Sequence, residues 1–223
     1  MSNILQKKWW KITGLVLVFY AIVGGMLLPV PARDILNETI RNLYYHVTMW
    51  FTMIVLLTIS VIYAIKYLSN FNINYDIIAR EINKVAMLFA LLGLFTGMLW
   101  AKFTWGAYWT SDPKLNGVAA SLLVYAAYFL LRNSLDDSEK RARFAAVYNI
   151  FAYVMMLVFI LIMPRLTASL HPGNGGNPAF ASYDLDNQMR LVFYPAVIGW
   201  ILVGLWIASI QIRHQFLIKK IND

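Results

Sequence analysis

The chain has 223 residues, of which 60% are hydrophobic and 13% are charged, and its formal net charge is +8. A water-soluble domain needs more polar residues than this to cover its surface. The Lys and Arg residues flank apolar runs, so they indicate membrane topology beside anionic headgroups rather than a nucleic-acid surface. Cysteine is absent, which excludes disulfides, thiolate metal sites, thiol nucleophiles and CxxCH haem attachment within this chain.

Six apolar runs predict an all-α, polytopic membrane helix bundle, because a spanning helix needs about 20 mostly apolar residues. We expect one transmembrane domain over 1–223, with no soluble domain beside it. Three lysines precede the first run, but no small-x-small cleavage site follows it, so we expect a retained first helix. The predicted spans are 12–30, 43–68, 85–101, 116–131, 144–163 and 191–212.

Lys and Arg are divided unevenly between the connectors. One alternating set, which includes both termini, carries 13 of the 19, and the other set carries 6. The positive-inside rule therefore predicts that both termini are cytoplasmic and that the connectors after spans one, three and five face outward. The third outward connector contains the turn-forming run PGNGGNP over 172–178, which we expect to be flexible.

His46 is the first functional candidate, in the run LYYHVTMW at the outer end of span two. Trp50 follows one helical turn later on the same face. An ionisable residue near membrane depth is costly, and it is a functional candidate for that reason. The alternative is an interfacial histidine that is hydrogen-bonded to a neighbour.

His171 is the second candidate, at the outer end of span five. A single loop histidine is usually just solvated, but two of the three histidines fall on the same predicted side, each near the end of its own span. Neutral imidazoles are good axial ligands for haem iron. The third histidine, His214, lies among basic residues on the other side, and we interpret it as an ordinary interfacial residue.

The third candidate is the Trp-rich connector 101–116. If it is helical, Trp105, Tyr108, Trp109 and Asp112 share one face and form an aromatic ledge that ends in a carboxylate. Flat aromatic side chains suit a flat, apolar macrocycle at a wet interface. The alternative is an ordinary aromatic belt, although a belt does not require the Gly106 or Asp112-Pro113 found here.

Together these three constellations resemble the CcmC family of cytochrome c maturation proteins (haem exporter protein C), which belongs to a haem-handling superfamily marked by a Trp-rich WWD segment. The family's segment reads W-G-x-x-W-x-W-D, lies in the outward connector between spans three and four, and precedes a basic residue and Leu. The matching residues here are Trp105, Gly106, Trp109 and Asp112, followed by Lys114-Leu115, with Ser111 at the position of the third Trp.

The family's two outward histidines occur in an aromatic-His-Val and a Leu-His context, which match Tyr45-His46-Val47 and Leu170-His171. The resemblance covers essentially the whole chain. It implies non-covalent, transient binding of haem b at the outer (periplasmic) face, with His46 and His171 as the iron ligands. The implied haem-binding set is His46, Trp105, Gly106, Trp109, Asp112, Lys114 and His171.

The resemblance also implies haem transport in cytochrome c biogenesis, by a multi-pass protein of the inner (cytoplasmic) membrane. The implied partners are a periplasmic haem chaperone of the CcmE type, an ATP-binding transporter complex and the lipid bilayer, with no nucleic acid. We expect Asp112 to orient its connector by capping a helix or pairing with a base. The haem propionates need cations, and the outward candidates are Arg33, Arg41, Lys114, Arg165 and Arg190.

Three alternatives remain. A b-type electron-transfer cytochrome would need about four histidines inside the spans for two haems. A transporter or channel would need polar groups near the midplane, whereas the middles of the spans read as plain, with Gly24-Gly25, Gly93 and Gly97 as packing sites. A structural subunit would leave the outward His and Trp to chance. No nucleophile–base pair or carboxylate dyad stands out, so we do not expect an enzyme.

Overall fold

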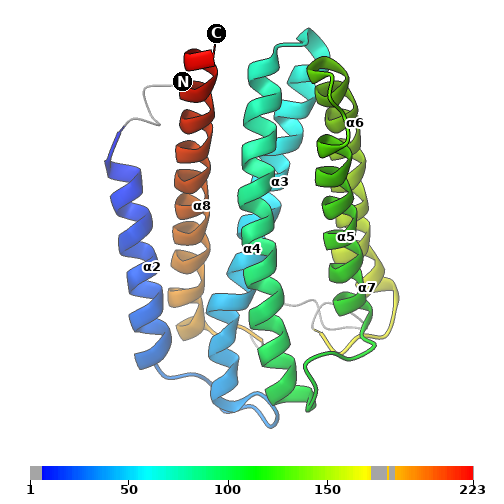
Figure 1. The fold of residues 1–223 in the computed structure, drawn as a ribbon. Helices are drawn as coiled ribbons and strands as arrows, with labels where there is room; N and C mark the ends of the chain where they lie inside the picture. Colours follow the sequence, from blue (N-terminus) through cyan, green and yellow to red (C-terminus); the bar gives the residue numbers. More distant parts are fainter. Residues whose placement is uncertain (1–6, 172–179, 181–183, 223) are drawn as a thin grey trace. The chain divides into compact units, whose positions relative to one another are not determined.

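The computed structural model describes residues 7–171, 180 and 184–222. Of the described residues 84% are helical, and no strand occurs among them. The run 172–178, expected to be flexible, lies outside them. In chain order (Figure 1) the elements are α2 (Trp9–Leu27), the 3-10 helix η1 (Asn37–Asn42), α3 (Leu43–Asn70), α4 (Ile73–Trp105), α5 (Pro113–Asn133), α6 (Ser138–Leu157), the π-helix η2 (Val158–Ile162), α7 (Met163–Leu166) and α8 (Asn187–Asn222).

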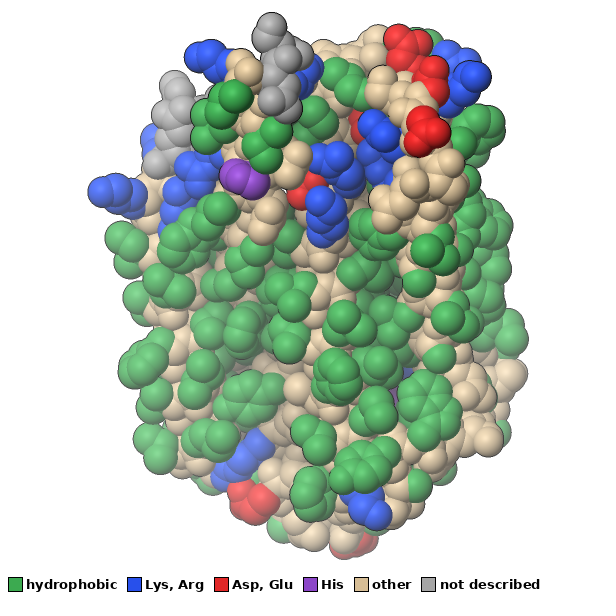
Figure 2. All heavy atoms as spheres, in the orientation of Figure 1, with side chains coloured by type: hydrophobic (Ala, Val, Ile, Leu, Met, Phe, Trp, Pro, Cys, Tyr) green, Lys and Arg blue, Asp and Glu red, His purple; other side chains and the backbone are tan. Residues whose placement is uncertain are grey.

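Six helical stretches of the described chain are long and apolar enough to cross a membrane, which confirms the predicted all-α membrane fold. Large apolar side chains such as Phe19, Leu123 and Phe151 are exposed on them, as expected where lipid replaces water. Figure 2 shows hydrophobic side chains over most of the visible face and charged side chains toward its ends.

The third span begins earlier than the predicted 85–101, because α4 starts at Ile73. Its first turns carry charged residues, so they fall outside an apolar window. Two of these residues are buried in ion pairs: Asp76 contacts Arg132, and Glu81 contacts Lys84 at 3.0 Å. Hydropathy therefore locates the apolar middle of this helix and misses its charged first turns.

The helices gather into two compact units, each built from segments that are distant in sequence. The single transmembrane domain over 1–223 stays a prediction.

In the first unit (described residues 7–56, 88–110, 180 and 184–222), α2 packs closely against α8. A Cβ on Gly14 would lie 2.9 Å from Leu202 Cβ, so the glycine permits this approach. The start of α2 and the end of α8 lie at the same end of this unit (Figure 1), as six crossings require.

The second unit (described residues 57–87 and 111–171) contains a polar core, so the expectation of plain span middles is wrong. Asn83 donates to Asn149 at 3.1 Å, Asn149 donates to Ser60 at 2.9 Å, and Ser60 donates to the carbonyl of Ala79 at 2.9 Å. All three polar side chains are buried. Ser60 and Asn149 are single polar residues inside apolar runs, and Asn83 lies among charged residues, so only the fold shows that they meet.

The fifth span contains a π-helix just before Pro164, where the N–H of Met163 bonds to the carbonyl of Val158. Proline lacks an N–H and cannot continue the α-helical hydrogen-bond pattern. Pro164 is therefore a local cause of the wider π-helical turn that precedes it. Gly117 of α5 packs against this turn, because a Cβ there would overlap the carbonyl oxygen of Phe159. The close approach brings the start of α5 beside the end of the fifth span.

Candidate functional site

His46 lies in the first turns of α3, and its ring is held against α4. Its Nδ1 is 2.9 Å from the carbonyl oxygen of Gly93 and 3.3 Å from Oγ1 of Thr96. A carbonyl only accepts hydrogen bonds, so Nδ1 carries the proton and Nε2 is the unprotonated nitrogen of the neutral ring. Trp50, one turn further on, donates its indole N–H to this Nε2 at 3.3 Å.

Two glycines of α4 make room for these rings. A Cβ on Gly97 would lie 2.5 Å from Cε1 of His46, and a Cβ on Gly93 would lie 2.8 Å from Cε2 of Trp50. Gly93 and Gly97 are therefore packing sites, as predicted. What they accommodate is an imidazole and an indole from α3. Gly93, Thr96 and Gly97 are spaced so that all three lie on one face of α4. Sequence reasoning identified the two glycines but not Thr96.

Trp100 of α4 borders the same imidazole. Its ring meets that of His46 edge-on, with centroids 5.9 Å apart and planes at 76°. Its indole N–H donates to Thr39 Oγ1 at 3.2 Å, and Asn42 donates to the carbonyl of Thr96 at 2.9 Å. These two bonds hold η1 against α4, and η1 is the segment that leads directly into the helix of His46.

The Trp-rich segment is not helical beyond Trp105, so the aromatic ledge on one helical face is wrong. The physical cause is Gly106, whose φ of +80° is a left-handed conformation that ends the helix. Lys102 donates to the carbonyl of Gly106 at 2.9 Å and lies over the ring of Tyr108. Tyr108 and Trp109 follow as irregular backbone and are 52% and 40% exposed, and Trp105 is half-buried.

Asp112, the last residue of this segment, is buried and accepts four hydrogen bonds. Oδ1 accepts from the backbone N–H of Lys114 at 2.9 Å and from Nδ1 of His171 at 2.9 Å. Oδ2 accepts from Oγ of Ser169 at 2.8 Å and from the N–H of Leu170 at 2.7 Å. The Lys114 bond caps the N-terminus of α5, so the helix-capping role expected of Asp112 is confirmed.

The charge state of Asp112 follows from these contacts. Burial raises the pKa of its carboxyl, but the hydrogen bonds from Ser169 and Leu170, together with His171 and Lys114, lower it below the usual range. The carboxylate is therefore ionised at neutral pH, and it can act only as an acceptor.

His171 is the main side chain that Asp112 orients, and its own side chain is 20% exposed. Burial lowers the pKa of this imidazole to about 4, and the positive charge of Lys114 acts in the same direction against the opposing effect of Asp112. The ring is therefore neutral at physiological pH, with the proton on Nδ1 and Nε2 unprotonated. The contact is a hydrogen bond from a neutral donor to a carboxylate.

The structure thus brings together only some of the predicted site residues. Asp112, Lys114 and His171 meet in the second unit. The other members of the set, His46, Trp105, Gly106 and Trp109, belong to the first unit. Convergence of the two imidazoles on one iron stays a prediction. Sequence reasoning missed Ser169, which carries no signal of its own beyond its place before His171.

Two of the basic propionate candidates have structural roles. Arg41 donates to the carbonyls of Gly25 at 2.8 Å and Leu28 at 2.6 Å, at the end of α2. Arg190 donates to the carbonyls of Leu185 and Phe180, each at 3.1 Å. Lys114, by contrast, belongs to the cluster of Asp112 and His171.

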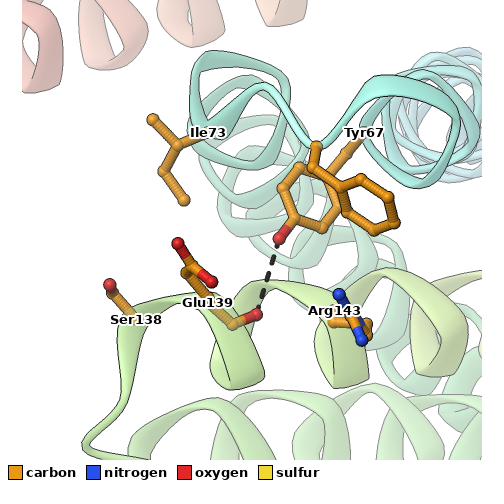
Figure 3. A pocket seen from close by; sticks show the side chains of 6 residues that line it. Tyr67, Ile73, Ser138, Glu139 and Arg143 are labelled. Carbon is orange, nitrogen blue, oxygen red and sulfur yellow. Dashed lines mark hydrogen bonds between the residues drawn. The ribbon is translucent and has the colours of Figure 1, made fainter.

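A separate cavity of about 380 Å³ lies at the N-terminus of α6, the other end of α5 from Asp112 (Figure 3). Tyr67 bridges it by donating to the carbonyl of Glu139 at 3.5 Å, and Arg143 lies over the ring of Phe71. Its lining contains one acidic and one basic residue, Glu139 and Arg143, so it has no single charge preference. Its lining residues are Tyr67, Phe71, Ile73, Ser138, Glu139 and Arg143.

These features define an α-helical multi-pass membrane protein with two oriented, neutral imidazoles near helix ends. Comparison with known proteins goes further: the CcmC family, described as Heme exporter protein C, matches residues 1–223, and the chain belongs to this family.

Individual relatives agree with this assignment. The chain is 30% identical to Heme exporter protein C of Bradyrhizobium diazoefficiens over 148 residues, which cover 66% of the chain and 56% of the relative. It is 23% identical to the Escherichia coli K12 protein of the same name over 136 residues, covering 61% and 54%. It is 35% identical to cytochrome c biogenesis protein CcsA of Chlamydomonas reinhardtii over 83 residues, covering 37% and 24%. The chain thus spans little more than half the length of the Heme exporter protein C relatives that it matches.

Proposed function

We propose that this chain binds haem b non-covalently at the outer face of the inner membrane and passes it to a periplasmic haem chaperone during cytochrome c biogenesis. His46 and His171 are the iron ligands in this proposal. The observation that carries it is the bond from His171 Nδ1 to Asp112, at 2.9 Å, because it joins one histidine to the Trp-rich segment. A ligand histidine commonly donates its other ring N–H to a carboxylate or carbonyl, which fixes its tautomer.

The two histidines fit this role in the same way. The Nδ1–H of His46 donates a hydrogen bond to the carbonyl of Gly93. The Nδ1–H of His171 donates a hydrogen bond to Asp112. Each ring therefore has Nε2 as its basic nitrogen, which is the atom that binds haem iron axially. Haem supplies the iron and the four porphyrin nitrogens itself. Two histidines are a donor set suited to the axial positions of its iron.

The apolar part of the site would come from Trp105 and Trp109. Burying aromatic surface against the macrocycle contributes about 25 cal/mol per Å² removed from water. Trp109 is 40% exposed, so it has surface to offer. Lys114, next to Asp112, would pair with a propionate as a point charge. Gly106 ends α4, so the residues after it are not held in a helix, and Trp109 would be able to adjust to the ligand.

The names of the relatives support a role in cytochrome c biogenesis, because they are a heme exporter protein and a cytochrome c biogenesis protein. We further propose that a CcmE-type chaperone and an ATP-binding transporter complex are the partners of this chain. The chain itself would bind and transfer haem without covalent chemistry, so we propose that it is not an enzyme.

The experiment is absorption spectroscopy of the protein purified in detergent and titrated with haem. We expect a b-type spectrum that changes or disappears in His46→Ala and in His171→Ala. His214→Ala is the matched control, since this histidine lies in α8, which contributes no residue to the candidate site, and it should leave the spectrum intact. Unchanged spectra in both single variants would refute the ligand assignment. A haem that stays bound and cycles reversibly between oxidation states, with no transfer, would favour the b-type cytochrome.

A further inference from the structure

Trp50 makes a contact with His46 that the proposed function does not require. The indole Nε1 of Trp50 lies 3.3 Å from Nε2 of the imidazole, and it donates a hydrogen bond to that nitrogen. The two rings meet edge-on, with centroids 6.0 Å apart and planes at 84°. The donor is therefore directed at the nitrogen assigned to iron, while the other ring nitrogen is held by Gly93.

An imidazole nitrogen has one lone pair in the plane of the ring, and it can serve one strong partner at a time. Haem iron needs this lone pair for its axial bond. Forming the Fe–Nε2 bond therefore requires breaking the Trp50 N–H···Nε2 bond, and the proton stays on the indole throughout. Loss of haem reverses the exchange, because the indole N–H can then return to the lone pair.

The packing around Trp50 favours this return. Its ring rests on α4 at Gly93, where even a Cβ would approach Cε2 of Trp50 to 2.8 Å, so the absence of a side chain there creates the seat for the indole. The same α4 segment holds the Nδ1 proton of His46 through Gly93 and Thr96. One short stretch of α4 thus positions both the imidazole and its competitor.

We propose that Trp50 competes with haem iron for Nε2 of His46, so that its indole N–H weakens haem binding and promotes haem release. This inference rests on the proposed function, since it takes His46 as an iron ligand. A carrier must release its ligand, and an internal donor that replaces iron lowers the cost of leaving a basic nitrogen unpaired. Trp50 is a positioning residue here, because it acts through His46.

The test compares haem dissociation from the full-length protein in detergent, with an excess of an apo-globin as haem scavenger. Trp50→Phe keeps an aromatic ring on Gly93 and removes the N–H. We expect haem to dissociate about 2- to 10-fold more slowly, the effect of removing one competing neutral hydrogen bond. The matched control is Trp9→Phe, which removes an indole N–H from an exposed side chain at the start of α2, outside the site, and it should dissociate like the unmodified protein.

A second measurement uses the haem-free protein, where the indole vibrational bands in ultraviolet resonance Raman spectra report hydrogen bonding of the N–H. His46→Ala should shift the Trp50 contribution to that of an indole without this acceptor. If Trp50→Phe fails to fold, replacement of Trp50 by benzothienylalanine removes the N–H while preserving the shape. Equal or faster haem dissociation in a folded Trp50 variant would overturn the proposal. Retention of haem in His46→Ala with an unchanged spectrum would instead overturn the assignment of His46 as an iron ligand, on which this inference rests.

Discussion

Asp112 and His171, which are far apart in sequence, are joined by a 2.9 Å hydrogen bond between a carboxylate oxygen and Nδ1. The same oxygen caps α5, and the second oxygen holds the two residues before His171. One buried carboxylate therefore sets the position of a helix, the path of a loop and the tautomer of an imidazole. Substitution of Asp112 should therefore alter the position and tautomer of the His171 imidazole, even if Asp112 does not contact haem.

The first prediction is that Asp112→Ala lowers haem affinity by about 10- to 100-fold, the usual effect of removing a partner that orients a metal ligand. Loss of the helix cap adds about 1 kcal/mol to the cost in stability. Haem titration followed by absorption measures the first effect, and thermal unfolding in detergent measures the second. Ser111→Ala is the control, since Ser111 is the exposed neighbour of Asp112 in the chain. Equal affinities for the two variants would contradict an orienting role.

The second prediction concerns pH. The pKa of His171 is lowered to about 4 from its ordinary value of 6.5, mainly by burial. Between these two values the unfolded chain takes up a proton on this ring and the folded chain does not, so the free energy of unfolding decreases as pH falls through this window. Above about pH 6.5 the ring is neutral in both states, and this group adds no pH dependence.

The measurement for this second prediction is nuclear magnetic resonance of the haem-free protein with labelled histidines, where His171→Ala assigns the signal. The imidazole of His171 should still be neutral at pH 5. A midpoint near 6.5 would show that the ring is not held as described. Asp112→Asn removes the carboxylate that opposes the shift, so the midpoint in that variant should not rise.

The third prediction tests the seat of His46. Gly97→Ala would place a methyl group 2.5 Å from Cε1 of the imidazole, so the ring or α4 must shift. We expect weaker haem binding and a loss of stability of about 1–3 kcal/mol, as for other overpacked sites. Gly24→Ala is the matched control, because its Cβ would meet its nearest neighbour, Val192, at an ordinary 3.6 Å. Similar behaviour of the two variants would show that the imidazole is not confined by α4.

The sequence predicted the helical fold well, because a run of apolar residues long enough to span lipid has few alternatives to an α-helix. It also predicted a helix cap at Asp112, which is confirmed, whereas the ligand roles of His46 and His171 stay predictions. It could not predict the partner of His46, since the carbonyl of Gly93 is a backbone group that any residue carries.

The Trp-rich segment shows the opposite limit. A spacing of three and four residues suggests a helical face, but one glycine at a φ of +80° ends the helix at Trp105 and redirects the residues that follow. The polar core of the second unit was missed for a different reason. Ser60, Asn83 and Asn149 lie on three different helices, and periodicity within one helix carries no information about pairing between helices.

The last prediction concerns the ion pair in that second unit. Arg132 donates two hydrogen bonds to the carboxylate of Asp76, at 2.6 and 2.8 Å, and both side chains are buried. Removing one charge leaves the other buried and unpaired, so Asp76→Asn should destabilise the protein by about 3–5 kcal/mol. Unfolding in detergent, followed by circular dichroism, measures this loss.

The matching double variant, Asp76→Leu with Arg132→Met, removes both charges and fills similar space. Its stability should lie close to that of the unmodified protein, because replacing a buried pair by apolar residues costs little or nothing. A double variant as unstable as Asp76→Asn would mean that the pair is required for more than charge balance. Haem binding should survive in a folded double variant, since Asp76 and Arg132 lie at the other end of α5 from Asp112 and His171.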